Sequence, residues 1–141
     1  MRIYILLALL IISKGTLAKT IQIEFTENDS YSIEVAYIDV GDTIEWLPKN
    51  KGHNVEFLVV PDMDALPNNS KINEFHSIFF KTPGVYLYGC SPHLNIGMLG
   101  LIVVDNDFHN LEDVNKVELS YVANSVAVSY THLTLPTIYS V

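Results

Sequence analysis

GVYLYGCSPHLNIGMLGLIVV, residues 84–104, is the most informative segment of this sequence. It begins with an apolar run rich in valine and tyrosine, reaches Cys90, and returns through a second apolar run. This pattern predicts two β-strands joined by a tight loop. The loop carries Cys90, which is the single cysteine of the chain, followed by His93 and then by Met98.

These three residues offer a thiolate, an imidazole and a thioether, a soft set of ligands that favours copper over magnesium, calcium or manganese. Blue-copper centres use two histidines, one cysteine and a long axial methionine. The second histidine must then come from elsewhere, and His53 within KGHNVE, residues 51–56, is the candidate. Zinc is the rival metal because cysteine and histidine also bind it. Methionine at this spacing argues against zinc as the native metal.

The N-terminus predicts export. Arg2 precedes an apolar run over residues 3–12, and small residues lead to Ala18, as in a secretory signal peptide. We expect residues 1–18 to be cleaved and the protein to be soluble and periplasmic. A membrane span needs about 20 apolar residues, so no membrane anchor is expected.

Export makes the cysteine count informative. A lone thiol in a secreted protein calls for an explanation. Cys90 could be a buried, inert residue, since free cysteine is among the most buried residue types. The neighbouring His93 and Met98 favour a metal ligand instead.

The chain is acidic. It has 8 basic and 16 acidic residues and a net charge of −8. Cleavage of the leader removes Arg2 and Lys14 and brings the net charge to about −10. This charge argues against a nucleic-acid partner and against a general phosphate-binding role.

Short alternating apolar sets follow one another along the chain and predict six or seven strands, as in an all-β sandwich. These sets are Ile21, Ile23 and Phe25; Tyr31, Ile33, Val35 and Tyr37; Ile44 and Trp46; Val55, Phe57 and Val59; and Ile78 and Phe80. Residues 61–70 are polar, contain proline and predict an irregular segment.

The C-terminal part changes character. Asn110 is a candidate N-cap, and apolar residues from Leu111 to Tyr121 at helical spacing predict one short helix ending near Asn124. We therefore expect one domain over residues 19–124. Residues 125–141 are interpreted as an atypical tail, neither helix nor core strand, and residues 128–141 of it resemble translated sequencing-adapter or vector sequence. Deletion of residues 126–141 is expected to leave folding and metal binding intact.

Several segments together resemble the pseudoazurins: VGDT at residues 40–43, KGHNVE at 51–56, SKINE at 70–74, PGVY at 83–86, and CSPH at 90–93 with Gly97-Met98. Pseudoazurins are exported type 1 copper proteins related to plastocyanin and amicyanin. The resemblance covers roughly residues 19–124. It implies an all-β cupredoxin fold, a Greek-key β-sandwich with a short C-terminal helix.

The resemblance also implies a site. It assigns His53, Cys90, His93 and Met98 as the ligands of one type 1 copper ion, and Asn54 as a tie between the two ligand loops. The implied function is one-electron transfer without catalytic residues. The alternative is a copper carrier or storage protein that delivers the metal rather than electrons.

The implied partners are redox proteins, such as a copper nitrite reductase, another periplasmic reductase or a cytochrome c, which dock transiently near His93 on a monomeric carrier. Pseudoazurins usually carry a lysine directly before the ligand cysteine, whereas Gly89 stands here. The acidic charge therefore favours basic partners. Leu94 and Ile96 supply an apolar docking patch beside His93.

Overall fold

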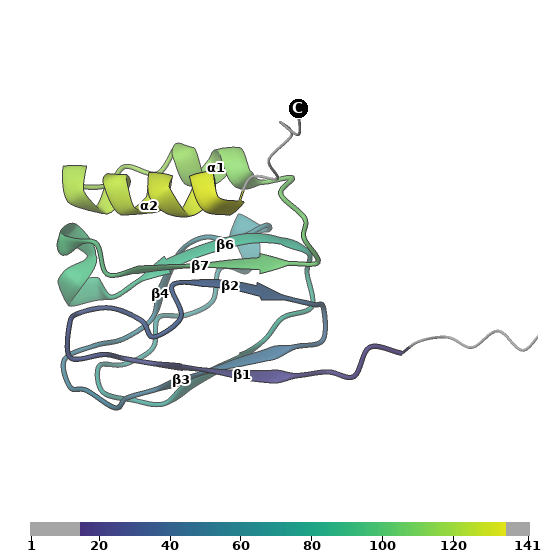
Figure 1. The fold of residues 1–141 in the computed structure, drawn as a ribbon, viewed down its shortest axis with the longest axis horizontal. Helices are drawn as coiled ribbons and strands as arrows, with labels where there is room; N and C mark the ends of the chain where they lie inside the picture. The colour runs from purple at the N-terminus through teal and green to yellow at the C-terminus, as the bar shows by residue number, and fades with distance from the viewer. Residues whose placement is uncertain (1–14, 135–141) are drawn as a thin grey trace, which may run out of the picture.

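The computed structural model describes residues 15–134, and within them seven strands form two sheets that pack face to face (Figure 1). The predicted β-sandwich is thereby confirmed. One sheet has three strands in the order β1 (Thr20–Glu24), β3 (Thr43–Leu47), β5 (His76–Phe79). The other sheet has four strands in the order β2 (Val35–Ile38), β7 (Leu99–Val104), β6 (Gly84–Gly89), β4 (Glu56–Val59).

β1 pairs with β3, and β2 with β7, in parallel, whereas the other pairings are antiparallel. β6 and β7 form the hairpin predicted from residues 84–104, and the 3-10 helix η2 (Ser91–Ile96) lies in the connection between them. The two ends of the candidate ligand loop are therefore fixed to neighbouring strands.

An interior cluster fills the space between the two sheets. Trp46 and Tyr88 lie fully buried at its centre, with their ring centroids 5.3 Å apart in an edge-to-face arrangement. The buried members of this cluster are Ile23, Phe25, Tyr31, Ala36, Ile38, Ile44, Trp46, Val55, Phe57, Val60, Phe80, Tyr86, Tyr88, Cys90, Met98, Ile102 and Val104. Two predicted metal ligands thus belong to the core.

An outer cluster covers the other face of the four-stranded sheet. The helices α1 (Leu111–Asn115) and α2 (Tyr121–Thr134) lie across β6 and β7 on this side (Figure 1). Its buried members are Val59, Val85, Leu87, Leu99, Leu101, Val103, Val114, Ala123, Ala127 and Tyr130. Because both faces of the hairpin are covered, every residue of β6 and β7 is buried.

The C-terminal prediction was wrong in two respects. The single helix expected to end near Asn124 is two helices, and α2 continues to Thr134, so that residues 125–134 of the segment expected to be neither helix nor core strand are helical. Ala127 and Tyr130 are buried, and the Tyr130 hydroxyl donates a hydrogen bond to the Leu99 carbonyl over 3.1 Å. The segment was misread because two of its buried positions, Ala123 and Ala127, are alanines, which give a weak hydrophobic signal.

Asn110 also departs from its expected role. It stands at the N-cap position of α1 without a side-chain capping bond. Its side chain instead accepts from the Val85 N–H and donates to the Val85 carbonyl, each over 2.8 Å. The asparagine therefore joins the start of α1 to the edge of β6, where the strand pairing leaves those backbone groups free.

The alternation of interior and exposed side chains predicted from Tyr31 to Tyr37 is interrupted after Tyr31. Tyr31 is buried, but Ala36 and Ile38 of β2 face the interior, and Tyr37 is 56% exposed. The residues between Tyr31 and Val35 are not strand, so alternation does not carry across them. A shift of register in β4 has a similar effect, because it places Phe57 in the interior cluster and Val59 in the outer one.

The predicted leader falls largely on residues outside the described range, as do residues 135–141. Among residues 15–134, no helix combines the length and the apolar character that a membrane crossing requires.

Candidate metal centre

The predicted ligands come from two loops at one end of the sandwich. Cys90 directly follows β6, His93 lies on η2, and Met98 directly precedes β7. Backbone hydrogen bonds close this loop tightly, with Cys90 N–H donating to the Met98 carbonyl over 3.0 Å and Met98 N–H to the His93 carbonyl over 3.2 Å. Gly97 ends η2 with φ of 93°, a conformation that favours glycine. His53 lies in the loop before β4.

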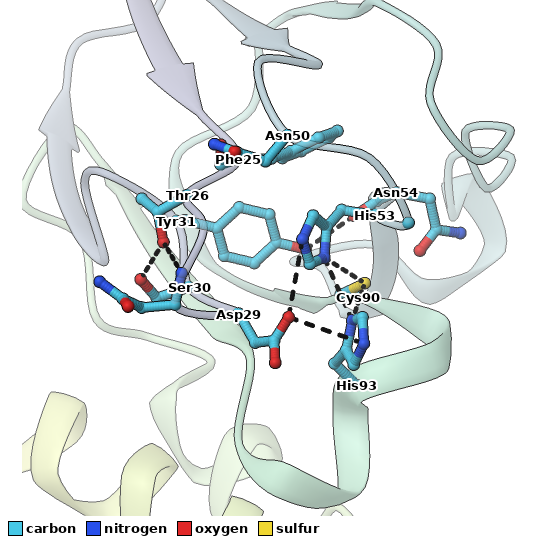
Figure 2. A network of polar contacts seen from close by, with 12 residues as sticks. Phe25, Thr26, Asp29, Ser30, Tyr31, Asn50, His53, Asn54, Cys90 and His93 are labelled. Atoms are coloured by element: carbon cyan, nitrogen blue, oxygen red, sulfur yellow. Dashed lines mark hydrogen bonds and ion pairs between the residues drawn. The ribbon is translucent and has the colours of Figure 1, made fainter.

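Three donor atoms converge in the site (Figure 2). His53 Nδ1 lies 3.1 Å from His93 Nδ1, while Cys90 Sγ lies 3.7 Å from the first nitrogen and 3.4 Å from the second. A point equidistant from the corners of such a triangle is about 2 Å from each, close to a metal–imidazole bond length. The spacing of this donor set therefore fits a metal ion.

The donors differ in exposure. Cys90 is fully buried, Met98 is 1% exposed and His53 is 3% exposed, whereas the His93 side chain is 27% exposed. The ligand set is thus closed on the core side and reaches solvent at one imidazole edge. Among residues 15–134, His53, Cys90 and His93 form the one group of three histidine, cysteine or acidic side chains close enough to share a metal ion.

Asn54 ties the two loops together, as the resemblance implied. Ser91 N–H donates to Asn54 Oδ1 over 2.7 Å, and Asn54 Nδ2 donates to Ser91 Oγ over 2.9 Å. The Tyr31 hydroxyl donates to the Asn54 carbonyl over 2.8 Å. Because Tyr31 and Asn54 are buried, the bonds fix the loop of His53 against the loop of Cys90.

Burial shifts the protonation of the donors. The pKa of His53 is lowered first by burial and then by repulsion from His93, which keeps its imidazole neutral at pH 7. Burial raises the pKa of the Cys90 thiol, although the backbone N–H groups of Asn54 and His93 oppose the rise. A metal ion that binds here must therefore displace the thiol proton.

Sequence reasoning missed Asp29. Its carboxylate oxygen Oδ1 lies 3.7 Å from Nε2 of both His53 and His93 (Figure 2). The sequence around Asp29 predicts only a turn, because ENDS at residues 27–30 is typical of a loop between strands. Nothing in the sequence places that turn beside ligands that follow it by 24 and 64 positions.

The expected docking patch is only partly exposed. Ile96 is 58% exposed, whereas Leu94 is half-buried and packs against the outer cluster. Gly89 is buried, and a Cβ atom there would lie 2.8 Å from Leu94 Cδ1 and 3.0 Å from Leu99 Cδ2. The packing of these leucines therefore opposes a lysine at the position directly before Cys90.

The remaining histidines lie away from this group. His76 is half-buried, with its ring centroid 5.7 Å from that of Trp46. His109 is exposed, and its Nδ1 lies 2.8 Å from the Asp107 carboxylate. His132 is exposed on α2.

Comparisons with known proteins agree with this geometry. Residues 19–105 match the family described as copper binding proteins, plastocyanin/azurin family. The chain is 34% identical to the pseudoazurin of Paracoccus pantotrophus in an alignment of 93 residues that covers 61% of each chain. It is 33% identical to the plastocyanin of Prochlorothrix hollandica in an alignment of 117 residues that covers 70% of this chain and 89% of the relative.

A solved structure of a pseudoazurin from Sinorhizobium meliloti superposes with a TM-score of 0.72 at 29% identity, covering 80% of this chain and 94% of that one. These matches confirm the resemblance to pseudoazurins. The chain spans 49% to 61% of the length of the curated pseudoazurins that it matches. The chain belongs to the plastocyanin/azurin family of copper-binding proteins.

Proposed function

We propose that this protein is a periplasmic one-electron carrier in which His53, Cys90, His93 and Met98 hold a single type 1 copper ion. The observation that carries the proposal is the triangle of two imidazole nitrogens and one thiol sulfur, with edges of 3.1, 3.4 and 3.7 Å, against the buried Met98. Copper bound by such a set supplies a reversible one-electron couple.

The residues around the donors support rapid transfer by holding the donor geometry constant. The loop of Cys90 is closed by backbone bonds to Met98, and Asn54 joins it to the loop of His53. A donor set that does not rearrange between oxidation states lowers the cost of exchange, because little reorganisation accompanies each electron.

Burial supports a carrier rather than an enzyme. Cys90, Met98 and His53 are enclosed, which leaves the edge of His93 as the solvent-facing part of the set. A partner can reach this edge without a substrate pocket. Weak redox complexes use small interfaces that form and separate quickly.

The proposed partner is a basic redox protein, such as a cytochrome c or a periplasmic reductase. The net charge of −8 for the full chain supports attraction to a basic surface. Ile96, exposed beside His93 on η2, supplies the apolar contact. Asp29, whose side chain is 44% exposed, adds a negative charge at the same edge.

Reversible oxidation tests this function against the alternative of a copper carrier or store. The copper-loaded protein is cycled between its oxidised and reduced forms in the presence of a competing copper chelator, while its optical spectrum is recorded. An electron carrier regains its full visible band over repeated cycles and keeps its copper. Transfer of copper to the chelator in either oxidation state would contradict the proposal and support metal delivery.

The docking face has its own test. Ile96→Lys is expected to slow electron transfer to a basic cytochrome c severalfold in stopped-flow experiments, because it removes an apolar contact and adds like charge. Phe79→Lys is the matched control, since Phe79 is an apolar residue of similar exposure (61%) that lies on β5 of the three-stranded sheet. Transfer to this partner should also slow as salt rises. Equal effects of the two variants would contradict docking at His93.

A further inference from the structure

One carboxylate faces both imidazoles of the candidate metal centre. Asp29 Oδ1 lies 3.7 Å from Nε2 of His53 and 3.7 Å from Nε2 of His93, the ring nitrogens that take no part in the triangle of Nδ1 and Sγ donors (Figure 2). We infer that Asp29 is a positioning residue of the copper centre, which holds the outer nitrogens of both histidines and favours the oxidised state of the site. This inference rests on the proposed function.

The turn that carries Asp29 is held rigidly. Thr26 N–H donates to the Ser30 carbonyl over 2.9 Å, and the two hydroxyls of these residues lie 2.7 Å apart. Phe25 and Tyr31 pair as an antiparallel bridge at the base of the turn. Asp29 itself has φ of 53°, a left-handed conformation that aspartate tolerates better than most residues. Its carboxylate is therefore presented from a fixed point.

A turn alone does not account for the direction of this side chain. The hydrogen bonds that close the turn are made by Thr26 and Ser30, and Asn28 N–H donates to Thr26 Oγ1 over 3.3 Å. The Asp29 carboxylate has no part in these bonds and points instead toward the two rings (Figure 2). The positive φ of the turn explains why an aspartate is tolerated at this position, and the contact with the two histidines explains the direction of its side chain.

The same turn also packs against the site. The Phe25 ring meets the His53 ring edge to face, with centroids 5.9 Å apart, and the Tyr31 hydroxyl donates to the carbonyl of Asn54, the residue after His53. The backbone on both sides of Asp29 is thus anchored to the loop of His53. Small movements of the turn relative to the rings are restricted, which a positioning role requires.

Two consequences follow from a carboxylate at this place. Attraction between the carboxylate and the two N–H dipoles favours the tautomer with the proton on Nε2, which leaves both Nδ1 atoms free to bind a metal ion. The oxidised site also carries one more positive charge than the reduced site. A nearby negative charge therefore stabilises the oxidised form and lowers the reduction potential.

Asp29→Asn tests this inference, because it keeps the shape and the tolerance of positive φ while it removes the charge. The reduction equilibrium of the copper-loaded protein is measured by redox titration. We expect the variant to favour the reduced form about tenfold more than the wild type does. Asp29→Gly, which keeps the backbone conformation and removes the whole side chain, should shift the equilibrium in the same direction.

Glu27→Gln is the matched control, since it removes one negative charge from the same turn at an exposed residue for which the structure gives no contact with either ring. Its shift should be less than about twofold because solvent screens the charge. Equal shifts in Asp29→Asn and Glu27→Gln would overturn the inference, and so would a lower reduction potential in Asp29→Asn.

A second readout separates position from charge. In the reduced protein, the Nε2 protons of His53 and His93 are expected to exchange with solvent severalfold faster in Asp29→Gly than in wild type, as followed by NMR. Unchanged exchange would refute the positioning role. A wild-type protein that binds no copper or shows no visible band would instead refute the proposed function, so the two failures can be told apart.

Discussion

The two faces of the β6–β7 hairpin carry different chemistry on the same backbone. Toward the interior it presents Tyr86, Tyr88, Cys90, Met98, Ile102 and Val104, and toward the helices it presents Val85, Leu87, Leu99, Leu101 and Val103. Since side chains alternate along a strand, the two sets are interleaved residue by residue. Aromatic rings and the candidate metal ligands lie on one side, and branched aliphatic side chains lie on the other.

This contrast indicates that the two faces of the hairpin have different roles. The interior face determines which metal the protein can hold and how its donors are arranged, whereas the outer face holds the hairpin in place through α1 and α2. Changes on the outer side should therefore reduce stability without altering the colour of the oxidised protein. Changes at the ligands should do the reverse.

Deletion of residues 126–141, which the sequence alone suggested would leave folding intact, should instead have the largest effect on stability. It removes Ala127 and Tyr130 from the outer cluster, together with Val126, which occupies the space that a side chain at Gly97 would fill. We expect a loss of about 5 kcal/mol in the free energy of unfolding, measured by urea denaturation. Deletion of residues 135–141 alone is the control, because it leaves these three contacts in place. An unchanged stability of the longer deletion would show that α2 contributes little.

Gly100→Ala should be the next most disruptive change. The Tyr88 ring lies directly over Gly100 on the paired strand, so a methyl group would push against a fully buried side chain. We expect a loss of about 2 to 3 kcal/mol in thermal or chemical unfolding. Gly41→Ala is the comparison, since Gly41 has positive φ but open space around it, and should cost about 1 kcal/mol. The reverse order would contradict the packing argument.

The two faces also differ in how well the sequence predicts them. Alternation identified Ile23, Ile44 and Trp46 as interior residues, and all three are fully buried. The outer face could not be read in that way, because β6 and β7 are buried on both sides and their apolar runs are continuous.

The candidate site shows the same limit. Cys90, His93 and Met98 are close in sequence, the need of a blue-copper centre for a second histidine made His53 the candidate, and the resemblance to a known family supplied the role of Asn54. The place of Asp29 depends on how the turn between β1 and β2 folds over the ligand loops, a long-range contact that no local pattern records. The helical register of α2 was hidden by its buried alanines.

Asn54→Ala should affect the candidate metal centre on the interior face and leave the packing of the outer face unchanged. The substitution leaves the Ser91 N–H without its acceptor in this part-buried contact and removes one link between the two ligand loops. We expect a loss of about 2 kcal/mol in stability and a change in the reduction potential, since the loops become free to move. Ser129→Ala on α2 serves as a control, because its hydroxyl is exposed. A potential identical to that of the wild type would argue against the tie.

The pH dependence of metal uptake should be a smaller effect. Since burial raises the pKa of Cys90, the free thiol is protonated at neutral pH, and binding of zinc as a redox-inert probe releases one proton. Affinity should rise about tenfold per pH unit below that pKa. Because the pKa of His53 lies below its ordinary value of 6.5, release of a second proton, from His53, contributes to this slope only below pH 6.5. Competition titrations against a chelator measure this slope, and a flat profile for wild type would contradict the raised thiol pKa.

The most direct test of the metal centre is the visible spectrum of the oxidised, copper-loaded protein, compared between wild type and two variants. Wild type should show an intense band from charge transfer between the Cys90 thiolate and copper, and Cys90→Ser should lose it entirely. Tyr130→Phe, which removes only the hydrogen bond to the Leu99 carbonyl on the outer face, should keep the band unchanged. An intense band that survives in Cys90→Ser would contradict the account.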